Sequence, residues 1–325
     1  MDASRQWSIR EVVEGASAAG EPTRLRILAL LAQQELAVLE LGRILDQSQP
    51  RVSRHLRLLA EAGLAERFRD GSWVFYRLAA DGPGAALVEA ALAALDPDDA
   101  PLRADRERLR GVQRAREVAA AEYFALNAER WDHIRSLQIA EAEVERAIAA
   151  AAGPGPFERL IDLGTGTGRM LRLLAPLARR SLGLDLSHQM LNVARTATAE
   201  LDRCELRHGD ILATGLPAGL SDIVVVHQVL HYLSDPAAAV AEAGRLVAPG
   251  GRLLVVDFAP HELEHLREAH QHRRLGFTDE EMARWTADAG LAEASVATLP
   301  PSQAEGLTVK VWCAVRPALQ QRAAA

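Results

Sequence analysis

The sequence predicts two domains of different class: a small, mainly α-helical domain with a β-hairpin, followed by an α/β domain with a parallel sheet. Three observations predict this. Apolar residues recur at helical spacing in TRLRILALL (23–31) and VLELGRIL (38–45). Beyond residue 158, short apolar runs alternate with helical patterns. Between the two regions, LDPDDAPL (95–102) and AAGPGPF (151–157) carry boundary-marking prolines and glycines. We therefore expect an N-terminal domain at residues 1–97, a helical connector at 98–152 and a C-terminal domain at 153–325.

The composition is typical of soluble globular proteins. The 325 residues leave room for two domains of ordinary size, and 49% hydrophobic with 25% charged residues argues against a disordered chain. No stretch approaches 18 consecutive apolar residues, and the start, MDASRQWSIR, lacks the apolar segment of a signal peptide. The two cysteines, Cys204 and Cys313, offer no disulfide framework. We expect a cytoplasmic protein without a membrane partner.

A helix predicted to begin near Ser48 has two different faces. Pro50 is tolerated in its first turn, and Gly63 ends it. Its apolar stripe consists of Val52, Leu56 and Leu59. The opposite side carries Pro50, Ser53, Arg54 and Arg57, with Arg51 on the flank. The following segment, LAERFRDGSWVFYRL (64–78), predicts two strands around a tight turn at Asp70–Gly71. Three helices followed by such a hairpin form a winged helix-turn-helix.

Local charge favours DNA as the partner of this first domain. The whole chain has a net charge of −7, but residues 43–77 contain seven arginines against four acidic residues. Arginine reads guanine in the major groove, and phosphate contacts hold the protein in register. The residues expected to face double-stranded operator DNA are Ser48, Gln49, Pro50, Arg51, Ser53, Arg54, Arg57, Arg67 and Arg69. The alternative is a helical domain used for dimerisation or docking only.

The segments QPRVSRHLRLLAEAGL (49–64) and RDGSWVFYRL (69–78) resemble the ArsR/SmtB family of bacterial repressors. The resemblance covers about residues 12–95 and implies a DNA-binding homodimer, with GAALVEAALAAL (84–95) as a dimer-packing helix. Metal-sensing members carry a Cys-x-Cys pair before the recognition helix. Here Ala37 and Leu39 occupy those positions, and neither can donate to a metal. We expect no metal at this site and an effector from elsewhere.

Seven strands are predicted in the second domain. The first five are RLIDLG (159–164), SLGLDL (181–186), CELRHGD (204–210), DIVVVHQ (222–228) and RLLVVDFA (252–259). We expect helices between them and therefore a parallel, Rossmann-like sheet with its chemistry at the carboxyl ends of the strands. The last two, ASVATL (294–299) and LTVKVWCAV (307–315), predict a hairpin at one edge.

The first of these strands leads into a glycine loop, LIDLGTGTGRM (160–170). A dinucleotide loop has the pattern G-x-G-x-x-G, but the third glycine is replaced here by Arg169, which would obstruct the helix–strand contact. Other residues suit an adenosyl ligand. Asp185 ends the second strand, where a carboxylate accepts both ribose hydroxyls, and Asp210 follows the third, where it can accept from an adenine amino group. Met190 can lie against the adenine face, and Asp162 would put negative charge near a cation.

The segments LIDLGTGTG, LGLDLS, HGDIL and VLHYLSDPAAAVAEAGRLVAPGGRLLVVDF resemble, in this order, the class I S-adenosylmethionine-dependent methyltransferases. The resemblance implies S-adenosylmethionine or S-adenosylhomocysteine as cofactor, and EYFALNAERWDHI (122–134) is similar to the family's cofactor-covering helix. The expected cofactor residues are Asp162, Gly164, Thr165, Gly166, Gly168, Asp185, Leu186, Met190, Gly209, Asp210, Ile211 and His227. An NAD-type Rossmann fold is the alternative, since both folds place an acid at the end of the second strand.

Methyl transfer needs an acceptor aligned with the sulfonium and sometimes a base. His227 and His231, near the end of the fourth strand, are the candidate catalytic residues; alternatively, they cap helix amides or cover the adenosine. If residues 261–276 form a helix, then His261, His265, Glu268 and His272 line one stripe of it. Imidazoles at such spacing can share a metal, but a solvated or domain-facing surface is the more usual outcome, and we assign no metal.

Two functional hypotheses follow. In the first, the chain is a homodimeric ArsR-type transcriptional regulator whose C-terminal domain binds S-adenosylmethionine or S-adenosylhomocysteine as effector, and the resemblance implies control of methionine or one-carbon metabolism genes. In the second, it is an active small-molecule methyltransferase with an appended DNA-binding domain. Both can hold together, because binding the cofactor does not by itself imply turnover.

Overall fold

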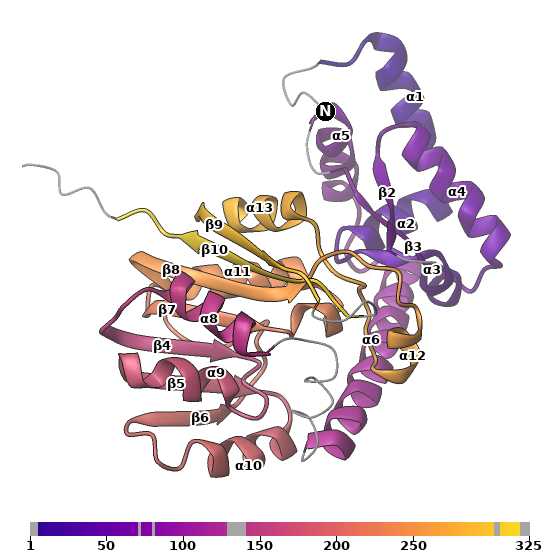
Figure 1. Ribbon diagram of the computed structural model, residues 1–325. Coiled ribbons are helices and arrows are strands. Elements are labelled where there is room, and N and C mark those ends of the chain that lie inside the picture. The colour runs from indigo at the N-terminus through magenta and orange to yellow at the C-terminus, as the bar shows by residue number, and fades with distance from the viewer. Residues whose placement is uncertain (1–5, 71–72, 80–81, 129–140, 302–305, 319–325) are drawn as a thin grey trace, which may run out of the picture. The chain divides into compact units, whose positions relative to one another are not determined.

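The computed structural model describes residues 6–70, 73–79, 82–128, 141–301 and 306–318 (Figure 1). The chain divides into two units, Met1–Val118 and Ala119–Ala325. One long helix, α6 (Ala100–Asn127), contributes residues to both, because the division falls within it.

The N-terminal unit contains the helices and the hairpin that the sequence predicts. Its elements are α1 (Ile9–Ala19), α2 (Pro22–Leu31), β1 (Leu36–Ala37), α3 (Val38–Leu45), α4 (Gln49–Glu61), β2 (Ala65–Asp70), β3 (Trp73–Leu78) and α5 (Gly82–Ala93). Local sequence sets several helix starts. The Ser8 hydroxyl accepts from the amide of Glu11 in a capping box, and Pro22 occupies the first turn of α2. The three strands form an antiparallel sheet in the order β1-β3-β2.

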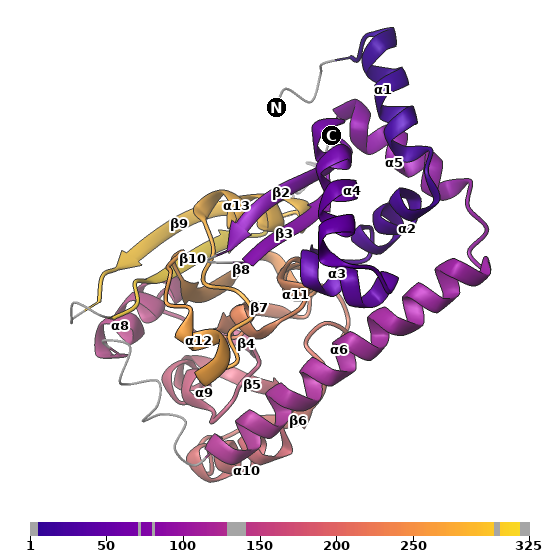
Figure 2. The same ribbon diagram turned by 90° about the vertical axis from the view of Figure 1, so that its right-hand side faces the viewer.

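The helix α4 lies beside the β2–β3 hairpin (Figure 2). Val52, Leu56 and Leu59 are fully buried, which confirms the predicted apolar stripe. Gly63, with a φ of +68°, follows the end of the helix as predicted, because glycine adopts this left-handed conformation without strain. Of the predicted hairpin turn, Gly71 lies outside the described residues, and the described ladder ends at the pair Asp70–Trp73.

The first part of α6 packs on this unit through both charged and apolar contacts. Asp105 is 1% exposed and accepts from the Arg26 guanidinium at 2.6 and 2.7 Å, while Leu109 is buried. The charged residues of α6 are therefore not all solvated, since Asp105 is buried in this packing. A buried carboxylate needs a paired, hydrogen-bonded cation, and Arg26 supplies it.

The C-terminal unit is built on a seven-stranded sheet in the order β6-β5-β4-β7-β8-β10-β9 (Figure 1). The strands are β4 (Phe157–Leu163), β5 (Ala178–Asp185), β6 (Cys204–His208), β7 (Ser221–His227), β8 (Val247–Phe258), β9 (Ala292–Leu299) and β10 (Val309–Val315). The first five are parallel, and β10 pairs antiparallel with β8 and β9. All seven predicted strands and the edge hairpin are confirmed.

Helices cover both faces of this sheet. One buried cluster joins the sheet to α11 (Pro236–Leu246) and α13 (Asp279–Asp288). The other joins it to α8 (Glu141–Ala152) and α9 (Arg169–Leu174). The remaining helical segments are α10 (His188–Ala197), α12 (His265–Ala269) and the short 3-10 turns η2 (Ala175–Leu177) and η3 (Leu230–Tyr232). Because the sheet is covered on both faces, side chains that point to either face are buried. This explains why the sequences of the parallel strands are continuous apolar runs.

One helix prediction is wrong, and a second segment considered as a helix is mostly not helical. Residues 209–220, between β6 and β7, contain no helix; Gly215 and Gly219 adopt positive φ there and Pro217 lies between them, a pattern that breaks helices. Of the helix considered over residues 261–276, only α12 is present. Gln271 has a left-handed φ of +58°, and His272 beyond it is buried, so tertiary packing of the histidine ends the helix early.

Candidate functional site

The glycine loop follows β4 at the carboxyl edge of the parallel strands. Gly164 has a φ of +73°, its amide donates to Leu184 O at 2.8 Å, and a Cβ there would lie 2.5 Å from Cγ2 of Val229. Gly166 has a φ of +52°, and a Cβ on it would meet no described atom within 4 Å. Gly164 is therefore required by packing inside the protein, whereas Gly166 opens onto free space where a ligand can approach the backbone.

Asp185, at the end of β5, is fixed by two backbone amides. Its Oδ2 accepts from the amide of Gly166 and its Oδ1 from the amide of Ser187, both at 2.8 Å. Burial raises the pKa of Asp185, and these two hydrogen bonds oppose that shift. The carboxylate thus ties the glycine loop to the start of α10 and stands ready to accept from neutral donors such as hydroxyls.

The other predicted acids differ in exposure. Asp162 is 1% exposed, and its Oδ2 accepts from the Thr165 hydroxyl at 2.6 Å, so it shapes the loop from beneath. Asp210 is exposed, and its Oδ1 accepts from the amide of Leu212. Gly209 links this segment to Asp185, because its amide donates to Asp185 O at 3.1 Å.

Apolar residues flank the same edge. Met190 is buried in the first turn of α10, where its amide donates to the Ser187 hydroxyl. Ile211 is buried, and Leu186 is 58% exposed. Gly168 precedes α9 with a φ of +82°, and a Cβ there would lie 3.0 Å from Cγ2 of Thr198. The predicted cofactor residues of β4, β5 and β6 are therefore brought to one edge, as the parallel topology requires.

Arg169 has a contact that accounts for its place after the glycines. Its guanidinium binds the Glu145 carboxylate of α8 through Nε and Nη2, both at 2.7 Å. Arg169 therefore pairs with a neighbouring helix at the position where a dinucleotide loop has glycine.

The ends of β7 and β8 carry a second group of polar residues. His227 pairs in register with Val256, so it stands at the same edge as the glycine loop and is half-buried. Gln228 has a strained, left-handed φ of +53°, and its buried Nε2 has no hydrogen-bond partner among the described residues. Strained backbone and an unpaired buried amide are features of binding sites.

His231 is held by a carboxylate that sequence reasoning missed. Its Nδ1 lies 2.7 Å from Oδ1 of Asp257, and the two residues are 1% and 0% exposed. A signal for Asp257 was present in the sequence, since it ends the apolar run of β8 just as Asp162 and Asp185 end theirs. Of the two candidate catalytic histidines, His231 has the oriented, buried geometry.

The predicted histidine stripe is not formed. His265 is exposed on α12, whereas His272 is buried with its ring 4.3 Å from that of His231. Burial lowers the pKa of His261 to about 4 and also lowers the pKa of His272. Among the described residues, no group of three or more His, Cys, Asp or Glu side chains is arranged to hold a metal ion.

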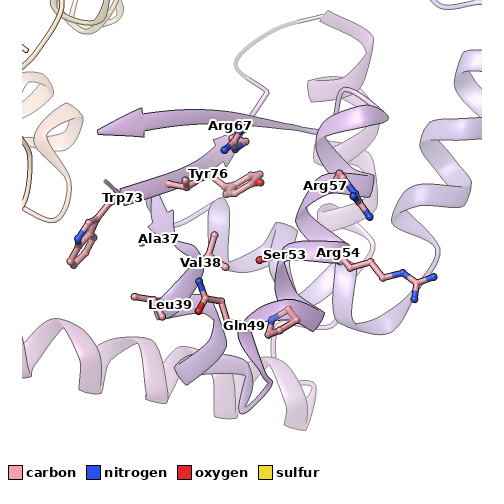
Figure 3. A pocket seen from close by; sticks show the side chains of 12 residues that line it. Ala37, Val38, Leu39, Gln49, Ser53, Arg54, Arg57, Arg67, Trp73 and Tyr76 are labelled. Carbon is pink, nitrogen blue, oxygen red and sulfur yellow. The ribbon is translucent and has the colours of Figure 1, made fainter. Parts of the chain in front are cut away.

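The N-terminal unit has its own candidate interface, a hollow of about 660 Å³ between α4 and the hairpin (Figure 3). From α4 the hollow is lined by Gln49, Pro50, Ser53, Arg54 and Arg57. From the β1–α3 segment and the hairpin it is lined by Ala37, Val38, Leu39, Arg67, Trp73, Val74 and Tyr76. Six of the nine predicted DNA-facing residues therefore share one concave surface.

The remaining predicted DNA-facing residues, Ser48, Arg51 and Arg69, are exposed outside this lining. Arg77, which adds to the local positive charge in the sequence, is half-buried and paired with Glu66 at 2.8 Å and Glu35 at 3.5 Å. Its charge is therefore largely neutralised within the domain.

Comparison with known proteins separates the same two regions. Residues 21–67 match the family described as "Bacterial regulatory protein, arsR family", and residues 161–255 match the family described as "Methyltransferase domain". The chain combines an ArsR-type helix-turn-helix region with a class I methyltransferase domain. No helix among its described residues is long and apolar enough to cross a bilayer.

Individual relatives cover one region each. The arsenical resistance operon repressor of Escherichia coli K12 is 52% identical over 59 residues, 18% of this chain and 50% of the repressor. Malonyl-[acyl-carrier protein] O-methyltransferase of Serratia marcescens is 33% identical over 156 residues, 47% of this chain and 58% of that enzyme. The chain spans about half the length of the curated relatives it matches.

Among solved structures, one chain of the complex between the Haloferax volcanii Trm112 methyltransferase activator and a methyltransferase is similar, with a TM-score of 0.51 and 21% identity. The likeness covers 60% of this chain and 97% of that one, and at this identity it supports the fold alone.

Proposed function

We propose that this chain is an ArsR-type DNA-binding transcriptional regulator of the cytoplasm whose methyltransferase domain binds S-adenosylmethionine or S-adenosylhomocysteine as its effector. One observation carries the proposal. The DNA-facing hollow has Ala37 and Leu39 where metal-sensing relatives carry thiolates, while the second unit of the same chain presents a preformed loop and acid for an adenosyl ligand. Following the family resemblance, we assign it to methionine or one-carbon metabolism genes.

The C-terminal edge fits an adenosyl sulfur compound. Asp185 is oriented to accept from a ribose diol, and the open space at Gly166 admits a ligand without a pyrophosphate. Asp210 is exposed after β6 and accessible to an adenine amino group, and Asp162 adds negative charge beneath the loop, which would favour a sulfonium. When bound, the methylated form supplies an electrophilic methyl group to this edge.

The proposal includes a homodimer, in keeping with the two-fold symmetry of bacterial operators. On α1 the apolar residues Ile9, Val12 and Val13 are 86%, 44% and 60% exposed. Three exposed apolar side chains within five residues of one helix are costly in water unless another surface covers them. A second copy of the chain is the partner we assign, with α1 in the dimer interface.

Sensing requires that the ligand favour one of two DNA-binding states. Helix α6 is the continuous element shared by both units, since it docks on the first through Arg26–Asp105 and ends in the second. We assign the coupling to this helix.

The proposal is tested with the 325-residue chain and a DNA duplex selected by it from a random pool. Fluorescence anisotropy at fixed salt measures duplex affinity without ligand, with S-adenosylmethionine and with S-adenosylhomocysteine. We expect one ligand to change the affinity about 5-fold or more, within the usual range of allosteric coupling. Equal affinities in all three states contradict the proposal.

A variant in α6 isolates the coupling. Val118 is exposed at the division between the units, so Val118→Pro interrupts the helix there, while Val118→Ala preserves it. We expect the proline variant to bind DNA and ligand separately but to lose the effect of one on the other. An unchanged ligand effect in the proline variant rules out α6 as the connection.

A further inference from the structure

The carboxyl edge of the sheet holds a histidine–carboxylate pair that ligand sensing does not use. In the sheet, β5 and β6 lie on one side of β4, and β7 and β8 lie on the other. Of the acids assigned to the adenosine, Asp185 ends β5 and Asp210 follows β6, whereas His231 lies in η3 after β7 and Asp257 lies near the end of β8. The pair is therefore at the edge that carries the glycine loop, on the side of β4 opposite the acids assigned to the adenosine.

The hydrogen bond within the pair fixes the role of each ring nitrogen. Asp257 only accepts when ionised, so Nδ1 of His231, 2.7 Å from Oδ1, carries the proton and Nε2 keeps its lone pair. Nε2 is buried and has no hydrogen-bond partner among the described residues. An imidazole with a free lone pair, oriented by a carboxylate on its other nitrogen, is the arrangement of a general base.

The residues around His231 suit a flat, aromatic acceptor and a positive charge on the His231 ring while it holds a proton. Its ring centroid lies 4.1 Å from that of Tyr232, 4.3 Å from that of His272 and 4.9 Å from that of Phe258. Because burial lowers the pKa of His261 and His272, both neighbouring imidazoles are neutral near pH 7 and do not repel a proton on His231.

The cluster reaches the surface on one side. Tyr232 and Phe124 are half-buried and meet edge to face, with centroids 4.8 Å apart. The other rings next to His231, those of Phe258 and His272, are buried. Tyr232 is therefore the described ring next to His231 that a molecule from solvent can contact.

We propose that His231, positioned by Asp257, accepts the proton of a small aromatic methyl acceptor that carries an O–H, N–H or S–H group. This inference rests on the S-adenosylmethionine binding proposed above and adds turnover to it. A lone pair of the acceptor forms a bond to the methyl carbon, and the methyl–sulfur bond breaks with its electrons remaining on sulfur. The acceptor proton passes to Nε2 of His231, then to water, leaving the methylated acceptor and S-adenosylhomocysteine.

The test uses the 325-residue protein, S-adenosylmethionine labelled in its methyl group, and catechol, aniline and thiophenol as probe acceptors. We expect label transfer to at least one probe. His231→Gln should lower the rate at saturating cofactor about 100-fold or more, without changing cofactor affinity by calorimetry. Asp257→Asn should also lower the rate. His265→Gln, at an exposed histidine of α12, is the matched control and should keep the wild-type rate within about 2-fold.

A second readout does not need the buried variants to fold. Nitrogen-15 NMR of the histidine-labelled wild-type protein should show the ring proton of His231 on Nδ1, with Nε2 unprotonated. A proton on Nε2 overturns the inference, as does wild-type transfer by a folded His231→Gln variant. If the protein binds S-adenosylmethionine but transfers label to none of the probes, the inference about His231 is overturned and the proposed function is not. If the protein binds neither cofactor form, the proposed function is overturned as well.

Discussion

Asp185→Asn gives the sharpest test of the cofactor site, because it changes hydrogen bonding with almost no change of shape. In the wild type, each carboxylate oxygen accepts a backbone amide at 2.8 Å, from Gly166 and from Ser187. Asparagine keeps one acceptor and places an N–H₂ group against the other amide donor. One amide therefore loses its acceptor, and a ribose diol has a single neutral oxygen to share instead of two charged ones.

The expected magnitude follows from the loss of one hydrogen bond to a charged group, about 1.5–3 kcal/mol. If this loss falls on the ligand, the dissociation constant of S-adenosylhomocysteine rises about 10- to 150-fold. Titration calorimetry at pH 7.5 measures this constant, and thermal melting checks that the variant is folded.

The chain provides a matched control in Asp222→Asn. Oδ2 of Asp222 accepts the amides of Glu158 at 2.7 Å and Arg159 at 2.9 Å, at the start of β4 and so at the opposite end of the parallel strands. This variant makes the same change of charge and should leave ligand affinity within about 2-fold of wild type. Equal losses of affinity in the two variants, or none in Asp185→Asn, would refute the assignment.

The same residue predicts a pH dependence with a definite sign. Burial raises the folded pKa of Asp185 above its ordinary value of 3.8, so its contribution to the stability of the free protein is present at low pH and lost as pH rises through the folded pKa. Ribose hydroxyls need the ionised form as their acceptor. Ligand affinity should therefore fall as pH is lowered through that raised pKa, and Asp185→Asn should remove this part of the dependence.

Three further predictions concern DNA binding, assembly and acid stability. Arg54→Ala should weaken binding to the selected duplex by about 1–3 kcal/mol in anisotropy titrations, and an equal loss in Arg110→Ala, an exposed arginine of α6, would show that only total charge matters. Val13→Asp, at a side chain 60% exposed on α1, should convert the dimer to monomer in sedimentation equilibrium, and a monomeric wild type would contradict the assigned interface. Because burial lowers the folded pKa of His261 from 6.5 to about 4, its contribution to stability is present above pH 6.5 and lost as pH falls toward 4. The melting temperature of the wild type should fall between pH 6.5 and 4. The fall should be smaller in His261→Gln and equal to that of the wild type in His265→Gln. An equal fall in all three proteins would show that His261 is not its cause.

The features that the sequence predicts well are those set by local pattern. Val52, Leu56 and Leu59 are buried because their spacing places them on one face of α4, and the apolar runs became strands because the sheet is covered on both faces. The acids at the ends of β4 and β5 were found because a charge that ends an apolar strand marks the edge where ligands bind.

The features that the sequence missed depend on tertiary contacts. The histidine stripe considered from the sequence needs a helix over residues 261–276, but His272 is buried against Phe258 and His231 and α12 ends at Ala269. Asp257 was not paired with His231, because 26 residues separate them and only the adjacency of β7 and β8 brings them together. Periodicity describes one element at a time and contains no information on such packing.

The central claim, that the C-terminal unit binds an adenosyl sulfur compound and reports it to the DNA-binding unit, is tested most directly by calorimetry of both cofactor forms with and without the selected duplex. We expect at least one form to bind in the micromolar range or tighter, and its affinity to change on DNA binding by the same factor as it changes DNA affinity. Failure of both forms to bind more tightly than the millimolar range contradicts the account.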